Sequence, residues 1–407
     1  MITVDTESFF VIVVIAALAA ITVAVVPRQF APPVVVVELL LGIVVGPEVL
    51  DLAKTDDFID FFSNLGLGML FFFAGYEIDF ERIKGAPLKL GLLGWLLSVT
   101  LAYAIGGALA AAGIVLSFLF TGSAMATTAI GTLIPILRDS GELKTRFGTY
   151  LLAAGGAGEF GPILLVTLVL STKQPLHEAA ILVGFVALAL ALALASVRLA
   201  WRGWSALERT LETSSQLAVR VTVVLVFGLV LLAGSLGLDV LLGGFVAGMI
   251  TRLALKGREL AVFESKLTAI GFGFFVPFFF VTSGIEFDLG ALGSAEALLK
   301  LAMFVGLFLV VRGTPALLLY RHVLQARQRM ALAFYSATEL PLVVAITTLA
   351  TEGGHMKGST AAGLVGAAML STLIFPFVGA ALQRRAVREG ETGPPGGPLP
   401  TGEQATA

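Results

Sequence analysis

Long apolar runs separated by short polar gaps follow one another along the chain. Each run holds roughly 16 to 25 residues, which is enough for an α-helix to cross the hydrocarbon core of a bilayer. The pattern predicts about thirteen membrane-spanning helices, numbered here as spans 1 to 13. They cover residues 9–26, 32–50, 58–78, 89–112, 115–137, 147–171, 178–201, 217–236, 238–253, 267–287, 296–319, 330–350 and 359–382.

The basic residues are distributed unevenly between the two sides of these spans. Of the 26 Lys and Arg, 21 fall on the side reached after each odd-numbered span. Four fall on the other side, namely Lys54, Lys173, Lys300 and Lys357, and Arg312 lies within a span. Positive charge marks the cytoplasmic side. The sequence therefore predicts a multi-pass protein of the cell membrane with its N-terminus outside and its C-terminus in the cytoplasm.

Two patterns occur twice, seven spans apart. Residues 71–79 (FFFAGYEID) end span 3 and residues 278–288 (FFFVTSGIEFD) end span 10, while 42–46 in span 2 and 244–248 in span 9 share GxxxG. An odd number of spans places the copies in opposite orientations, as in the inverted repeats of secondary transporters. The alternative is that both patterns are ordinary lipid-facing and helix-packing sequences. The acids of the longer pattern should mark span ends: Glu77, Asp79, Glu286 and Asp288.

The composition restricts the class of protein. It is 57% hydrophobic and 13% charged, whereas soluble proteins carry about 25% charged residues, so we expect an all-α polytopic protein in a lipid membrane. Basic residues form no single stripe, which argues against a nucleic-acid partner. The chain has no Cys, and its three His stand apart, so no disulfide, metal centre or cofactor is expected. No hydrolase motif lies at membrane depth, and we predict no enzyme activity.

The sequence predicts no further folded domain at either end of the membrane-spanning region. The first residues carry Asp5 and Glu7 but no basic residue, which favours a retained first span over a signal peptide. Residues 389–407 are rich in Gly, Pro and Thr and predict a disordered cytoplasmic tail. The sequence therefore predicts one transmembrane domain, residues 1–388, with no soluble nucleotide-binding domain.

Glu159 is the only charged residue in the apolar run of span 6. A carboxylate there costs about 2.5–3.5 kcal/mol on insertion scales and usually faces a cavity, a counter-charge or an ion path. The surrounding Gly155, Gly156, Gly158 and Gly161 allow close helix approach, and Pro162 removes one helix hydrogen bond. We therefore expect the carboxyl group of Glu159 to lie beside irregular, accessible backbone and to bind a cation or a proton.

Two further charges lie deep in predicted spans. Arg312 in span 11 should have a carboxylate partner or a hydrated cavity, and Glu159 and Glu339 are the candidate partners. Glu339 lies in the middle of span 12, two residues before Pro341, which favours an unwound segment. Glu339 is the second candidate for cation or proton binding, and Arg312 would compensate charge.

Weaker candidates supply oxygen ligands. Span 5 is rich in hydroxyl residues, and Thr127, Thr128 and Ser123 could offer oxygens to a hard monovalent cation. The alternative is that a Thr hydroxyl only bonds a carbonyl one turn back. Glu38 in span 2 is a possible further site. The histidines lie in or beside predicted loops and are not expected in the site: His177, His322 and His355.

The order of these motifs resembles the second cation/proton antiporter family, over roughly residues 9–382. The resemblance rests on Pro32-Pro33 with Glu38, Gly42 and Gly46-Pro47, on FFFAGYEIDF, on span 5 ending in LIPILR, on the acidic span 6, on FFFVTSG and on the basic residue of span 11. That family includes bacterial sodium/proton antiporters and glutathione-gated potassium efflux proteins.

The resemblance implies a homodimer, in which a dimerisation domain lies beside a core domain where broken spans 5 and 12 cross at the ion site. In sodium/proton members, an Asp-Asp or Asn-Asp pair occupies the positions of Gly158 and Glu159 here, and the second acid carries the proton or cation. Arg312 matches the basic residue that pairs with the ion-site acid. Without the first acid, Arg312 would pair with Glu159 or with Glu339.

These observations predict a secondary-active antiporter that exchanges sodium or potassium for protons by alternating access. Competition between a proton and a cation for Glu159 would enforce exchange. One carboxylate suggests electroneutral exchange, unless Glu339 also titrates. The alternative is a proton- or sodium-coupled symporter or organic-anion carrier on the same scaffold. A channel is disfavoured, because no filter-like repeat or charged ring is present.

Overall fold

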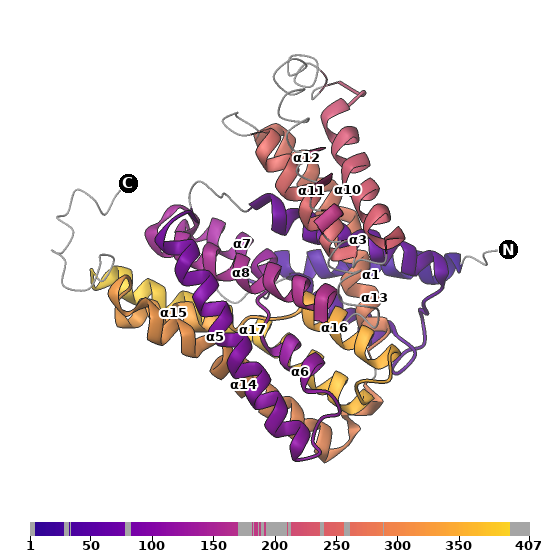
Figure 1. Cartoon of the computed structure of the whole chain (residues 1–407). Helices are drawn as coiled ribbons and strands as arrows, with labels where there is room; N and C mark the ends of the chain where they lie inside the picture. The colour runs from indigo at the N-terminus through magenta and orange to yellow at the C-terminus, as the bar shows by residue number, and fades with distance from the viewer. Residues whose placement is uncertain are drawn as a thin grey trace. The chain divides into compact units, whose positions relative to one another are not determined.

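The computed structural model describes residues 5–27, 32, 34–77, 83–169, 213–236, 240–255, 261–287 and 289–390, with isolated positions between 181 and 210. Every regular element in this part of the chain is a helix (Figure 1). The chain forms two compact units, each assembled from two separate stretches. Unit 1 combines Met1–Asp79 with Thr167–Phe287, and unit 2 combines Phe80–Val166 with Asp288–Ala407.

Within the described residues, unit 1 shows two groups of three successive helical spans. Its described helices are α1 (Thr6–Val25), α2 (Val34–Val45), α3 (Asp57–Glu77), α10 (Leu217–Ser235), α11 (Val240–Ala254), α12 (Ala261–Ile270) and α13 (Val276–Ile285). A π-helical stretch, Gly271–Phe275, joins α12 to α13, so predicted span 10 begins earlier than expected. The two groups of helices meet in a buried hydrophobic cluster that includes Ile12 of α1, Ile59 of α3 and Phe278 of α13.

Within unit 1, the GxxxG helix of each predicted repeat packs on the FFF helix of the other repeat. Helix α2, which carries the first GxxxG, packs on α13, which carries the second FFF. Helix α11, which carries the second GxxxG, packs on α3, which carries the first FFF. A Cβ on Gly42 would overlap the carbonyl oxygen of Val281, and one on Gly248 would overlap that of Phe72. Each GxxxG therefore allows close backbone contact with a helix of the other copy.

Unit 2 contains the two broken spans. Its described helices are α5 (Ala86–Ala111), α6 (Phe118–Met125), α7 (Ile130–Asp139), α8 (Arg146–Val169), α14 (Ala295–Leu319), α15 (Ala326–Ser336), α16 (Pro341–Glu352) and α17 (Gly358–Arg388). Short 3-10 turns lie at Glu142–Lys144, Gly290–Gly293 and Tyr320–His322. Span 5 is interrupted at 126–129 and span 12 at 337–340. Pro341 begins α16, where its missing N–H breaks no helical bond.

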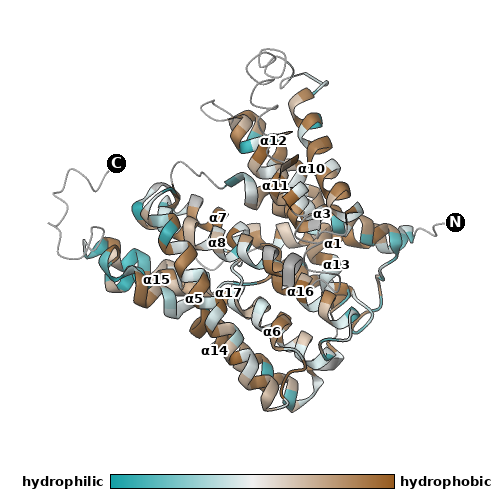
Figure 2. Ribbon diagram, viewed as in Figure 1, coloured by the Kyte–Doolittle hydropathy of each residue, from teal (hydrophilic) through white to brown (hydrophobic). Residues whose placement is uncertain are grey.

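The described helices agree with the predicted spans wherever the two can be compared. Eight described helical stretches are long and apolar enough to cross a membrane, three of them formed by neighbouring elements together: Ala261–Ile285, Ala295–His322 and Ala326–Glu352. Shorter apolar helices lie at Val34–Val45, Phe118–Ile134 and Leu241–Ala254. Apolar residues run along the helices, and hydrophilic ones gather at helix ends and connections (Figure 2). Most of span 7 (178–201) and the tail after residue 390 lie outside the described residues, as do Asp79, Asp288 and His177. The number thirteen stays a prediction.

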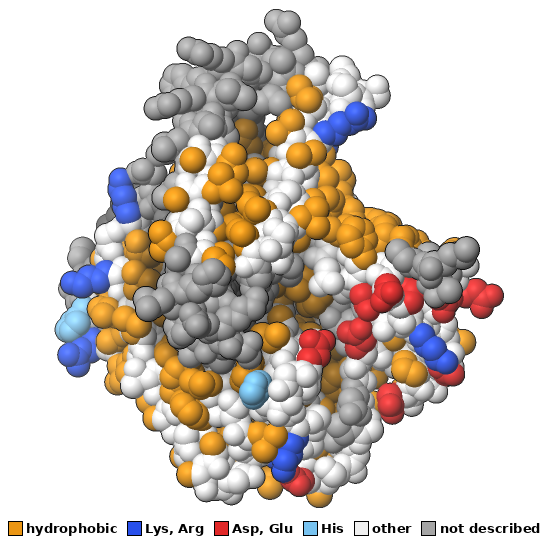
Figure 3. All heavy atoms as spheres, turned by 45° about the vertical axis from the view of Figure 1, so that its right-hand side comes forward, with side chains coloured by type: hydrophobic (Ala, Val, Ile, Leu, Met, Phe, Trp, Pro, Cys, Tyr) orange, Lys and Arg blue, Asp and Glu red, His pale blue; other side chains and the backbone are white. Residues whose placement is uncertain are grey.

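The surface view agrees with this division between apolar helices and polar ends. Hydrophobic side chains spread over much of the face in Figure 3, while acidic side chains gather in one region of it. Exposed acids occur where helices of unit 1 begin, at Asp5 and Glu7 for α1 and at Asp57 for α3. Asp5 also caps α1, because its carboxylate accepts from the backbone N–H groups of Glu7 and Ser8.

Candidate functional site

The interrupted segments of the two broken spans meet in unit 2. The backbone N–H of Ala129 donates to the carbonyl of Thr338 at 2.7 Å. The hydroxyl of Thr128 donates to the carbonyl of Ser336, the last residue of α15, at 2.6 Å. Each segment therefore satisfies backbone groups that the other leaves unpaired, which unwound chain at membrane depth requires. We call this region the crossing and define it as residues 126–129 and 337–340.

Arg312 of α14 reaches the crossing and is held there by neutral oxygens. Its Nε and Nη2 donate to Oγ1 of Thr128 at 2.9 and 2.6 Å. Its Nη1 donates to Ser98 of α5 at 3.0 Å, and Nη2 also reaches the carbonyl of Ala154 at 3.3 Å. No carboxylate among the described residues lies within ion-pair distance of this guanidinium. Arg312 thus makes no direct ion pair with Glu159 or Glu339 in the described part of the chain, although its charge interacts with that of Glu339 at longer range. Its pairing with either acid during transport stays a prediction.

Two prolines expose backbone carbonyls that the site uses. Pro162 in α8 has no N–H for the carbonyl of Gly158, and the backbone N–H of Thr128 donates to that carbonyl at 3.0 Å. Pro315 in α14 likewise leaves the carbonyl of Val311 without its helical donor, and the hydroxyl of Ser98 bonds it at 3.0 Å. Helix α8 runs unbroken through Pro162. The irregular backbone expected around Glu159 therefore belongs to the crossing and not to its own helix.

Glu159 faces the N-terminal end of α7. Its side chain is 2% exposed, and the backbone N–H of Gly131, in the first turn of α7, lies near its carboxylate. Helix N-termini favour negative charge, because their N–H groups lack partners within the helix. Its Oε2 atom is buried and has no hydrogen-bond partner in the described part of the chain. The helix N-terminus thus favours the ionised carboxylate of Glu159, and Oε2 is left without a partner among the described residues, so it could bind a proton or a cation.

Glu339 lies within the crossing itself. It is fully buried, and its Oε2 accepts a hydrogen bond from Thr127 at 3.2 Å. Ser371 and Thr372 of α17 hold its backbone, since Ser371 accepts from its N–H and the hydroxyl of Thr372 donates to its carbonyl. Its Oε1 has no hydrogen-bond partner among the described residues. Unit 2 therefore buries two carboxylates beside the same crossing, each with one oxygen unpaired.

The remaining sequence candidates lie in less direct positions. Ser123 is fully buried and shares a 3.0 Å hydrogen bond with Tyr103, so its hydroxyl is already paired. Glu38 is 3% exposed but belongs to α2 of unit 1, where its Oε2 also lacks a partner among the described residues. His355 stacks on Phe120, and His322 ends the turn after α14. In the described residues, no group of three or more His, Asp or Glu could hold a metal ion.

Sequence reasoning missed several residues that fix the site. Ser98 and the pair Ser371 and Thr372 are fully buried hydroxyl residues within apolar helices. Such positions could have been suspected, since a buried hydroxyl in an apolar helix commonly bonds a backbone carbonyl. Their partners could not be read from the sequence.

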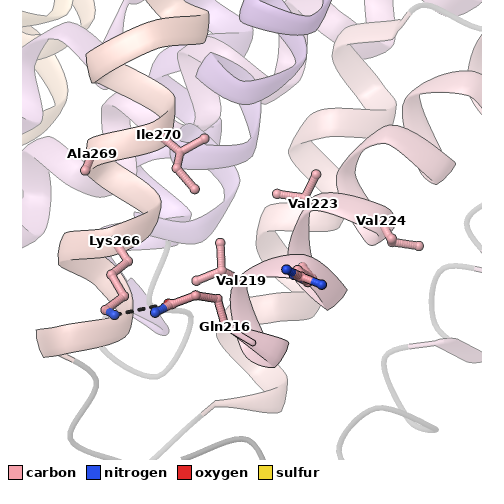
Figure 4. Close-up of a pocket in the computed structure, with 8 residues that line it drawn as sticks. Gln216, Val219, Val223, Val224, Lys266, Ala269 and Ile270 are labelled. Carbon is pink, nitrogen blue, oxygen red and sulfur yellow. Dashed lines mark hydrogen bonds between the residues drawn. The ribbon is translucent and has the colours of Figure 1, made fainter. Parts of the chain in front are cut away.

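A larger hollow in unit 1 has different chemistry. It lies between α10 and α12 and has a volume of about 760 Å³ (Figure 4). Lys266 donates to the side-chain oxygen of Gln216 at 3.1 Å at its edge. Its described lining is otherwise apolar or basic and contains no acid: Val219, Arg220, Val223, Val224, Ala269 and Ile270. A cation would find no anionic ligand among these residues, so the ion site is better sought at the crossing.

Inverted repeats with broken helices beside buried charged groups are typical of the class of secondary transporters. A family model described as "Sodium/hydrogen exchanger, transmembrane" matches residues 13–383. The chain belongs to this sodium/hydrogen exchanger family, whose members are transporters and not enzymes.

Individual relatives agree with this assignment. The chain is 28% identical over 277 residues to the Na+/H+-K+ antiporter GerN of Bacillus cereus, covering 65% of this chain and 68% of GerN. It is 24% identical over 374 residues to YjbQ of Bacillus subtilis, covering 87% of this chain but only 59% of YjbQ. The sodium proton antiporter MjNhaP1 of Methanocaldococcus jannaschii has the same fold, with a TM-score of 0.63, 15% identity and coverage of 95% and 97% of the two chains.

Proposed function

We propose that this protein exchanges a monovalent cation, sodium or potassium, for protons across the membrane by alternating access, with Glu159 as the group that binds either one. The observation that carries the proposal is the carboxylate of Glu159, which is 2% exposed, lies near the N-terminus of α7 and keeps Oε2 without a partner among the described residues. A buried carboxylate with a free oxygen needs a proton or a cation to be stable. Both cannot occupy that oxygen together, so binding of one releases the other.

Arg312 supports this role through its neutral partners. Its guanidinium donates to hydroxyl and carbonyl oxygens and does not occupy the oxygens of Glu159. A fixed positive charge at the crossing would stabilise an ionised carboxylate in the interval between release of one ligand and binding of the other. Glu159 would then remain able to bind either ligand.

Glu339 is the second candidate carrier. Thr127 donates to one of its oxygens and the other is unpaired, so it could add a ligand to the cation or balance the charge of Arg312. Its backbone is fixed by Ser371 and Thr372, which favours a fixed supporting role over a carrier role. Direct ligation by Thr127, Thr128, Ser123 or Glu38 stays a prediction.

The names of relatives support cation/proton exchange. GerN is named a Na+/H+-K+ antiporter, and a relative in Enterococcus hirae, 25% identical over 269 residues, is named a Na+/H+ antiporter. These names favour sodium or potassium as the cation. Dimerisation, an external N-terminus and a cytoplasmic C-terminus also belong to the proposal.

Transport in proteoliposomes tests the proposal. The purified full chain would be reconstituted with a pH dye inside, and sodium, potassium or lithium would be added outside. Antiport predicts that at least one cation drives protons out, so that the interior becomes more alkaline. Proton entry together with a cation or an organic anion would instead establish the symporter on the same scaffold. Protein-free liposomes report passive leakage.

A further inference from the structure

A small cavity lies beside Arg312, between helices α5, α8, α14 and α15 of unit 2. Helices α5 and α14 run side by side there (Figure 1). The cavity has a volume of about 10 Å³ for a water-sized sphere, and its lining includes Gly94, Trp95, Arg312, Tyr320 and Ser336. That volume is close to what one water molecule needs.

Two polar atoms on this lining have no partner. They are Nε1 of Trp95 and Oη of Tyr320, and both are buried without a hydrogen bond in the described part of the chain. Tyr320 is 2% exposed, and its Oη lies 3.9 Å from the position that a Cβ on Gly94 would take. A buried polar group left unsatisfied costs about 1–3 kcal/mol, so native structures almost always pair such groups with protein or water.

The guanidinium of Arg312 offers a further donor to the same cavity. Of its five N–H groups, Nε–H bonds Thr128 and also reaches the carbonyl of Ser336 at 3.4 Å. The two on Nη2 bond Thr128 and Ala154, and one on Nη1 bonds Ser98. The second N–H of Nη1 has no bond within the described residues. Three of the residues that line the cavity, Trp95, Arg312 and Tyr320, thus each carry a polar hydrogen with no partner in the described part of the chain, whereas the carbonyls of Ala154 and Ser336 already accept hydrogen bonds.

We propose that this cavity is a binding site for one ordered water molecule that positions Arg312. The water accepts from the indole N–H of Trp95 and from Nη1 of Arg312, and it bonds the hydroxyl of Tyr320. Three polar partners match the usual coordination of a buried water. Thr128 and Ser98 hold Arg312 on the sides facing the crossing and α5, and the water holds the remaining edge of its guanidinium.

Thermal stability tests this site, because a bound water and a dry cavity predict opposite shifts of the melting temperature. Tyr320→Phe removes only the hydroxyl oxygen. If the water is bound, the variant takes away one of its partners, and the melting temperature of the full chain falls. If the cavity is dry, the variant removes an unsatisfied buried hydroxyl, and the melting temperature rises. Tyr103→Phe, which removes a hydroxyl paired with Ser123 on the same helix α5, calibrates the loss of one hydrogen bond.

A double-mutant cycle separates the water from unrelated packing effects. Trp95→Phe also reduces volume, so its own shift does not decide the question. The proposal predicts that Tyr320→Phe lowers the melting temperature in the wild-type background but much less in the Trp95→Phe background, because both side chains bind one water. Equal shifts in both backgrounds, or a rise in both, overturn the proposal. The readout needs no transport, so its failure would leave the proposed antiport untouched.

Discussion

At the scale of single residues, Gly158 and Arg312 form a complementary pair. A Cβ on Gly158 would overlap Nη2 of Arg312 and lie 2.7 Å from Oγ1 of Thr128. Any side chain at residue 158 would therefore displace the guanidinium from Thr128. Sequence reasoning identified Gly158 as the position that lacks the first acid of the family pair. It could not predict that Arg312 fills this space, because side-chain direction across three helices is not written in local sequence.

Gly158→Ala should impair transport although alanine is the better helix former. In an open helix position, Gly→Ala stabilises by up to about 1 kcal/mol. Here the added methyl group pushes Arg312 from Thr128, and loss of one charged hydrogen bond, about 1.5–3 kcal/mol, weakens apparent cation affinity by about ten- to a hundredfold. Cation titrations of proton exchange in proteoliposomes measure this change.

The matched control is Gly107→Ala on α5, where a Cβ meets open space. That variant should transport as wild type. In an Arg312→Lys background, Gly158→Ala should have little further effect, since an ammonium group does not fill the volume taken by Nη2. A full-size effect of Gly158→Ala in that background would contradict the steric explanation.

At the scale of elements, the GxxxG contacts of unit 1 connect the two repeats. The sequence predicted both copies and their opposite orientation from their spacing. It did not predict that α2 packs on α13 and α11 on α3, since pairing between repeats depends on contacts between residues far apart in the sequence, such as Gly42 with Val281 and Gly248 with Phe72. Helix α8 provides a contrasting case. Pro162 suggested irregular backbone, but Thr128 bonds the freed carbonyl of Gly158 and the helix continues.

Gly248→Ala tests the contact between α11 and α3. Its Cβ would overlap the carbonyl oxygen of Phe72, which is backbone and cannot rotate away. The helices must separate, and overpacking of this kind costs about 1–3 kcal/mol. We expect a lower melting temperature of the purified protein. Gly228→Ala on α10, where a Cβ meets open space, is the control and should leave the melting temperature unchanged or raised. Equal behaviour of the two variants would argue against tight packing at Gly248.

At the scale of the whole molecule, composition and apolar periodicity predicted the all-helical class and most span positions. The breaks in spans 5 and 12 were expected from the family resemblance and occur at 126–129 and 337–340. The sequence also selected Glu159, Glu339 and Arg312, because a charge deep in an apolar run is rare. It could not show that neutral oxygens hold Arg312, nor that Ser98, Ser371 and Thr372 complete the site, since buried hydroxyl residues are common in membrane helices.

The central claim is that Glu159 is the group that exchanges a proton for a cation. The most direct measurement compares wild type, Glu159→Gln and Glu339→Gln in proteoliposomes with an internal pH dye and equal amounts of reconstituted protein. Melting temperatures equal to that of wild type would show that both variants are folded. The amide of Gln keeps the shape of the carboxyl group but can neither ionise nor release a proton. We predict that cation-driven proton movement disappears in Glu159→Gln and persists at a reduced rate in Glu339→Gln. Exchange that survives in Glu159→Gln and is lost in Glu339→Gln would contradict the claim and transfer the carrier role to Glu339.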